Sequence, residues 1–110
     1  MYLPTDSEWD AIIEADGRQG AACTALHRAQ HWRSLALDAL HRCQQGDGRG
    51  AARAARRERR ACRALVGAWR RYRLATIERV HIRQQLDQWV GPQDLALVAE
   101  IESQAQGRRR

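Results

Sequence analysis

A stretch of forty residues, 51–90, constrains the fold most, because it contains no proline and only one glycine, Gly67. Apolar residues recur along it at alternating steps of three and four, the spacing that places side chains in one stripe of an α-helix. Such a helix would be about 60 Å long at about 1.5 Å per residue. The pattern therefore predicts a long helix that packs against a second one. The stripe consists of Ala51, Ala54, Ala61, Leu65, Ala68, Tyr72, Ala75, Ile82, Leu86 and Trp89, and it is interrupted at Glu58 and Arg79.

A second helix is predicted over 21–44, where small and apolar residues form a stripe that permits close helix packing. Three glycines within 46–50 end this helix and predict the turn of a helical hairpin. The large side chains of Trp32, Trp69 and Trp89 are expected to fill an interface otherwise lined by alanine. The stripe on this second helix consists of Ala22, Leu26, Ala29, Trp32, Ala36, Ala39, Leu40 and Cys43.

Shorter helices are predicted at both ends of the chain. Thr5 and Glu8 form a capping-box pattern at the start of the first helix, which Gly17 and Gly20 weaken or break. Pro92 is well placed to begin the last helix. We therefore expect one all-α domain over the whole chain, built as an antiparallel, coiled-coil-like helical hairpin with short N- and C-terminal helices. The four predicted helices cover residues 6–16, 21–44, 51–90 and 92–105, and a basic tail occupies 107–110.

The charge balance of the chain is basic. Nineteen arginines, with no lysine, stand against thirteen acidic residues, which gives a formal net charge of +6. This balance favours nucleic acid, an anionic membrane surface or an acidic protein face as a partner. No apolar run approaches the roughly eighteen residues of a membrane span, and residues 1–6 lack the basic and apolar regions of a signal peptide. We expect a cytoplasmic protein without membrane insertion.

The sequence offers little for catalysis or metal binding. It has no glycine-rich phosphate loop and no nucleophile elbow, and its acidic residues are scattered. Cys23, His27 and His31 share one helix face with a spacing that suits a soft divalent metal, but no fourth ligand is near them. The prediction is a protein that is not an enzyme and that holds no cofactor and no metal.

Arginines crowd the start of the long helix, and five of them are expected on the side opposite its apolar stripe. This face is either the ordinary solvated side of an amphipathic helix or a surface for phosphates or an acidic protein. Like charges near a helix N-terminus repel one another and oppose the helix dipole, and this cost suggests a use. The candidate binding residues on this face are Arg53, Arg56, Arg57, Arg60 and Arg63.

A local resemblance to a known family covers about a third of the chain. Residues 83–89, Arg-Gln-Gln-Leu-Asp-Gln-Trp, followed by Asp-Leu-Ala-Leu at 94–97, resemble the second-helix region of the FliJ/YscO group. These proteins are the stalks of flagellar and type III secretion export ATPases. The segments 69–72, Trp-Arg-Arg-Tyr, and 77–78, Ile-Glu, are similar in kind to that group's tryptophan-containing helix start.

The resemblance implies an antiparallel two-helix hairpin that inserts into the ring of an export ATPase and contacts the export gate or secretion chaperones. Leu86 and Trp89 would then be partner-binding residues, and Trp89 beside the helix break is also a candidate anchor on its own. The sequence thus favours a non-enzymatic helical adaptor, as a monomer or a homodimer. Two other functions stay open: a small basic nucleic-acid-binding protein that uses the arginine face, and a small inhibitor or regulator of a larger complex.

Overall fold

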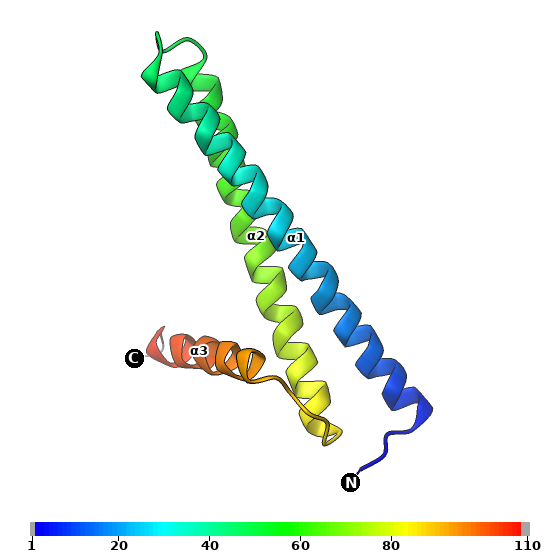
Figure 1. Cartoon of the computed structure of the whole chain (residues 1–110). Coiled ribbons are helices and arrows are strands. Elements are labelled where there is room, and N and C mark those ends of the chain that lie inside the picture. Colours follow the sequence, from blue (N-terminus) through cyan, green and yellow to red (C-terminus); the bar gives the residue numbers. More distant parts are fainter. Residues whose placement is uncertain (1, 109–110) are drawn as a thin grey trace. The chain divides into compact units, whose positions relative to one another are not determined.

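The structure is a computed structural model in which residues 2–108 are described, and within this range it contains three α-helices and no strand. Helix α1 spans Asp6–Gln45, α2 spans Ala51–Gln85 and α3 spans Pro92–Arg108 (Figure 1). Helices α1 and α2 form an antiparallel hairpin. The predicted all-α class and the helical hairpin are therefore confirmed.

The boundaries of the first helix differ from the prediction. Helix α1 runs without a break through Gly17 and Gly20, where the sequence had suggested two separate helices. A glycine inside a helix costs about 1 kcal/mol relative to alanine, and the burial of Ile12 and Leu26 on either side offsets that cost. The capping box is confirmed: the Thr5 amide donates to Glu8 Oε1 at 3.0 Å, and the Glu8 amide donates to Thr5 Oγ1 at 3.3 Å.

Helix α2 ends at Gln85, five residues before the predicted end. Asp87 adopts a positive φ of 52°, and the amide of Gln88 donates to the carbonyl of Arg83 at 2.8 Å. This pair of features is a Schellman termination, in which a left-handed residue ends the helix and satisfies a free carbonyl. The aspartate at 87 takes the position that glycine usually holds, so the apolar periodicity alone could not locate the end of the helix.

The glycine-rich turn between α1 and α2 lies where the sequence predicted it. Gly48 and Gly50 have positive φ angles of 81° and 72°, a conformation that other residues adopt only at a cost. The amide of Gly48 donates to the carbonyl of Cys43 at 3.2 Å, and the side chain of Asp47 accepts from the amide of Arg49 at 2.9 Å. These contacts end α1 and fix the turn that leads into α2.

At the other end of the chain, α3 extends beyond its predicted limit. It includes Gly107 and Arg108, which the sequence had placed in a basic tail. The rest of that predicted tail, residues 109–110, lies outside the described residues.

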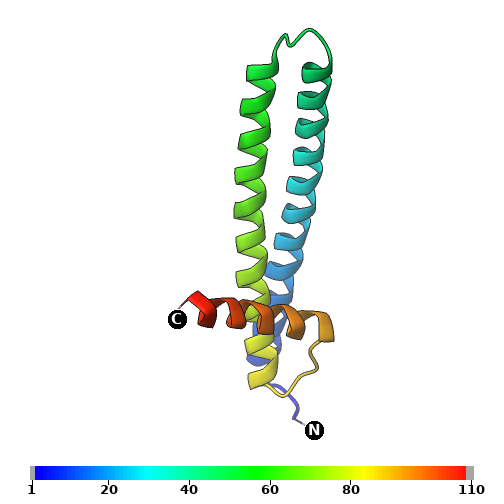
Figure 2. The ribbon, with the colours of Figure 1, turned by 90° about the vertical axis from the view of Figure 1, so that its left-hand side faces the viewer.

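Tertiary contacts divide the chain into two compact units. The three-helix unit contains the described residues up to Ala22 and those from Arg71 onward, and α3 lies across α2 in it (Figure 2). Its core consists of side chains from all three helices that are at most 7% exposed, namely Ile12, Ala15, Thr76, Val80 and Val98. Each fully buried Ile or Val side chain contributes roughly 1.5–3 kcal/mol to such a core.

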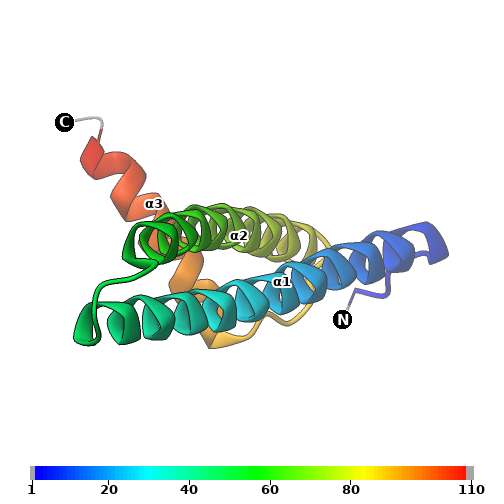
Figure 3. The same ribbon diagram turned by 90° about the horizontal axis from the view of Figure 1, so that it is seen from above.

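The two-helix unit covers Cys23–Arg70 and has a much thinner core. Here the end of α1 and the start of α2 lie side by side (Figure 3), and the buried apolar residues are only Leu26, Ala54 and Ala68. Trp32 is 65% exposed and Trp69 is 40% exposed, while Trp89 in the three-helix unit is 75% exposed. The prediction that these tryptophans fill the helix interface is therefore wrong: Trp32 and Trp69 stay exposed on their helices, and Trp89 lies beyond the end of α2.

None of the helices formed by residues 2–108 combines the length and the apolar character that crossing a bilayer requires.

Candidate functional site

A groove of about 560 Å³ runs along the two-helix unit between α1 and α2. Nine of its twelve lining residues are Trp, Leu, Ala, Cys or Gly, so its surface is mainly apolar, and the other three are arginines. The α1 side is lined by Trp32, Leu35, Ala36, Ala39 and Cys43, and the α2 side by Gly50, Arg53, Ala54, Arg57, Arg60, Ala61 and Ala64.

The two sides of the groove differ in chemistry because each helix presents a different stripe to it. On α1 the lining residues recur at steps of three and four, which places Trp32 and Leu35 beside small residues. The side chains of Trp32 and Leu35 are 65% and 45% exposed. On α2, the same spacing brings Arg53, Arg57 and Arg60 to the opposite side. Between these side chains, the buried or half-buried alanines Ala36, Ala39, Ala54 and Ala61 form the floor of the groove, so the groove has one apolar wall and one cationic wall.

This geometry corrects the predicted arginine face. Arg53, Arg57 and Arg60 do not lie opposite the apolar stripe, since they line the groove together with Ala54 and Ala61 of that stripe. Arg56 and Arg63 are exposed and lie outside the groove lining. The five predicted arginines therefore separate into three that border an apolar surface and two that do not.

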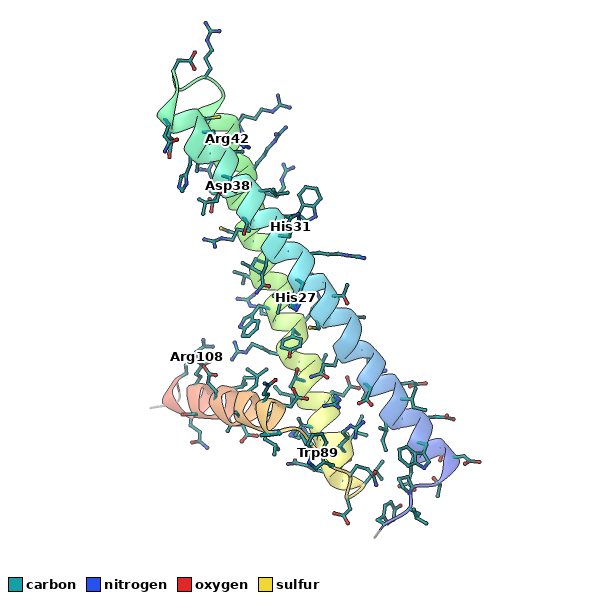
Figure 4. The ribbon with its side chains drawn as sticks, in the orientation of Figure 1. His27, His31, Asp38, Arg42, Trp89 and Arg108 are labelled. Carbon is teal, nitrogen blue, oxygen red and sulfur yellow. The ribbon has the colours of Figure 1, made fainter. Side chains whose placement is uncertain are left out.

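Charge is strongly segregated between the two units. Positions 23–70 hold eleven arginines and three acidic residues, whereas positions 1–22 and 71–110 together hold eight arginines and ten acidic residues. The two-helix unit thus carries an excess of eight positive charges. Its acidic residues include Asp38, which follows His27 and His31 along α1 toward Arg42 (Figure 4). A surface of this kind attracts polyanions and acidic protein segments.

One polar chain connects the two helices of this unit. Arg33 Nε donates to Cys62 Sγ at 3.3 Å, and Cys62 Sγ donates to Glu58 Oε1 at 2.9 Å. The hydrogen bond to Cys62 raises the pKa of Arg33, and the negative charge of Glu58 acts in the same direction. Glu58, an interruption in the predicted apolar stripe, therefore has a structural role in joining α2 to α1.

Leu86 and Trp89, the two other predicted binding residues, belong to the three-helix unit. Leu86 is half-buried just after α2. Trp89 is 75% exposed in the connection to α3 (Figure 4), and its ring lies near Gly91. Arg83 Nη1 donates to the carbonyl of Trp89 at 3.2 Å. The backbone of this connection is thus held in place while the indole ring stays accessible.

An ionic cluster joins the three helices of the three-helix unit. Arg79 Nε donates to Asp16 Oδ1 at 2.7 Å, Arg83 Nη2 donates to Asp16 Oδ2 at 2.6 Å, and Arg79 Nη1 also donates to Asp94 on α3. Burial opposes ionisation of Asp16, but the hydrogen bonds and charges of Arg83 and Arg79 together outweigh it and lower the pKa of this carboxyl. Arg79, an interruption in the predicted stripe, therefore links α3 to both α1 and α2 through Asp94 and Asp16.

The predicted metal candidates are only partly brought together. Cys23 Sγ and His27 Nε2 lie 3.6 Å apart on α1, one turn from each other. Across residues 2–108, no cluster of three or more His, Cys, Asp or Glu side chains is arranged to hold a metal ion. His31, the third member of the predicted set, follows further along the same helix (Figure 4).

Sequence reasoning missed the groove as a site, although it had named most of the residues that line it. Trp32, Ala36, Ala39 and Cys43 were assigned to the helix interface, and only the structure shows that they line an open surface. The available signal was the run of alanines on both helices, since a pair of such stripes cannot bury large neighbours. Comparison with models of known families, with characterised proteins and with solved structures finds no match for this chain.

Proposed function

We propose that this protein is a non-enzymatic helical adaptor that binds a protein partner, in the form of a stalk or chaperone-like component of a type III export ATPase complex. The observation that carries the adaptor function is the set of large apolar side chains left exposed on the folded chain, above all Trp32 on α1 and Trp89 in the connection to α3, at 65% and 75%. Exposed aromatic side chains in fixed positions are the usual anchors of protein interfaces.

The specific export role rests on the local resemblance of residues 83–89 to the FliJ/YscO group, and the antiparallel hairpin agrees with it. In this role Leu86 and Trp89 contact the ATPase ring or the export gate. The basic two-helix unit supplies a second surface for a chaperone or another subunit. No chemistry is required of the chain itself.

A direct binding experiment tests the proposal. The 110-residue chain is mixed with the export ATPase encoded in the same genome. Complex formation is followed by size-exclusion chromatography with light scattering, together with the rate of ATP hydrolysis. We expect a stoichiometric complex that Leu86→Ala or Trp89→Ala weakens at least tenfold. Leu74→Ala is the matched control, because Leu74 is 68% exposed on α2 of the same unit and is not one of the proposed binding residues.

Nucleic-acid binding is the second candidate, and the excess of eight positive charges in the two-helix unit favours it. In this case the affinity for a generic duplex falls steeply with salt, and neutralising three arginines reduces the slope by up to about three. Tight duplex binding at physiological salt, with no complex with the ATPase, would reject the adaptor in favour of this function.

A further inference from the structure

We propose that the groove of the two-helix unit binds one amphipathic helix of a partner protein, with the partner's apolar stripe on the alanine floor and its acidic residues along the α2 side. This inference rests on the proposed adaptor function and adds to it the kind of segment that is bound. It concerns the groove, whereas Leu86 and Trp89 belong to the three-helix unit.

The shape of the groove fits a helix. On the α2 side the lining runs from Gly50, just before the helix, to Ala64. This is a length of about 21 Å at about 1.5 Å per residue, which corresponds to about four turns of a partner helix. Ala36, Ala39, Ala54 and Ala61, which are buried or half-buried in the groove lining, are small enough to let a third helix approach both α1 and α2 closely. An amphipathic helix presents its apolar residues at the matching three- and four-residue steps.

The chemistry of the two walls sets the orientation and the charge of that helix. Trp32 and Leu35 form the apolar wall on α1, and they provide an anchor for one or two large apolar side chains. Arg53, Arg57 and Arg60 follow one another along the other wall and favour carboxylates at the corresponding positions of the partner. The partner helix is therefore acidic along one edge only.

Two other occupants fit less well. A second copy of this chain placed groove to groove about a two-fold axis would bring the same arginine walls together, which is unfavourable. A nucleic-acid backbone would satisfy the arginines but would leave the apolar floor and the wall formed by Trp32 and Leu35 without apolar contacts. Charge complementarity together with an apolar floor thus selects an acidic amphipathic helix.

The test uses three fluorescent 18-residue helical peptides that share one leucine stripe and differ only in their flanking residues, which are glutamate, glutamine or lysine. Binding to the full chain is measured by fluorescence anisotropy at 0.15 M salt, where charges further apart than about 8 Å are largely screened. We expect the glutamate peptide to bind at least tenfold more tightly than the lysine peptide. Equal binding of the three peptides, or no binding of the glutamate peptide, would overturn the proposal.

Two triple variants separate contact in the groove from overall charge. The changes Arg53→Gln, Arg57→Gln and Arg60→Gln remove the cationic wall and should reduce the preference for the glutamate peptide to less than threefold. The control changes Arg56→Gln, Arg59→Gln and Arg63→Gln remove the same charge from exposed positions outside the groove lining, and they should alter affinity less than twofold. Equal losses in both triple variants contradict docking in the groove.

A footprint locates the peptide independently of charge. Cys43 lines the groove and Cys23 does not, so the bound glutamate peptide should slow alkylation of Cys43 by iodoacetamide and leave Cys23 unaffected. Trp32→Ala should weaken peptide binding at least tenfold, and circular dichroism should show unchanged helicity because this side chain is 65% exposed. Unprotected Cys43 in the saturated complex rejects the site.

The remaining outcomes identify the other occupants. A concentration-dependent dimer that Trp32→Ala dissociates would assign the groove to a second copy. If duplex DNA protects Cys43 from alkylation and the glutamate peptide does not, the groove would be assigned to nucleic acid. If the glutamate peptide does not bind but the chain still forms the complex with the export ATPase, only the proposal about the groove is rejected. If neither the peptide nor the ATPase binds, the proposed adaptor function is rejected as well.

Discussion

Removal of the Arg79 guanidinium should destabilise the attachment of α3 more than any surface substitution. The Arg79 side chain is 17% exposed and bonds both Asp16 on α1 and Asp94 on α3. In Arg79→Met the apolar stem of the side chain is kept and its charge is lost. Asp16 then retains Arg83 at 2.6 Å, whereas within residues 2–108 Asp94 retains the side-chain Nε2 of Gln19 as a donor at 3.3 Å.

The size of the effect follows from these contacts. Removing one partner of a fully buried ion pair costs about 3–5 kcal/mol, because the other charge is left uncompensated. Here one carboxylate, that of Asp94, loses its main partner while its side chain is still 18% exposed, so we expect a loss of about 2 kcal/mol. Against a total stability of roughly 5–15 kcal/mol for a domain this is a large fraction.

The assay is urea unfolding followed by circular dichroism at 222 nm, combined with amide hydrogen exchange in α3. A double-mutant cycle of Arg79→Met with Asp94→Asn should give a coupling of about 1–2 kcal/mol. The same cycle on Arg18 and Glu78, whose side chains are 49% and 44% exposed, should give less than about 1 kcal/mol. A coupling at Arg79 no larger than that of the exposed pair would refute the reasoning.

Three further predictions concern α1 and the end of α2. Gly17→Ala should stabilise the protein by about 0.5–1 kcal/mol, since a Cβ there meets no atom within 4 Å; a lower urea midpoint would contradict a relaxed helix at this position. Asp87→Gly should raise thermal stability by about 0.5–1 kcal/mol, because Asp87 has a φ of 52°, and Asp87→Ala should lower it. The free energy of unfolding should fall as the pH drops below about 4, because the pKa of Asp16 is lower in the folded chain and stability is greatest when this carboxyl is ionised. Asp16→Asn should flatten this pH dependence of stability. An unchanged pH profile in Asp16→Asn would show that the ionic cluster is not its source.

The sequence by itself determined the helical class, the hairpin turn and the capping box. Each depends on interactions between residues close in the chain: the spacing of apolar side chains, the positive φ angles of Gly48 and Gly50, and the reciprocal hydrogen bonds of Thr5 and Glu8. The physical cause of each such pattern lies in neighbouring residues, so the pattern can be interpreted without knowing which distant residues it contacts.

Only the tertiary structure decided where the helices end, which tryptophans are exposed and what the arginines border. Whether α1 continues past Gly17 depends on the burial of Ile12 and Leu26, and the role of Arg79 depends on Asp16 and Asp94, which are distant in sequence. The groove depends on how closely two alanine stripes approach each other. Periodicity places residues on one face of a helix, but the packing of two helices determines whether that face is covered or left open.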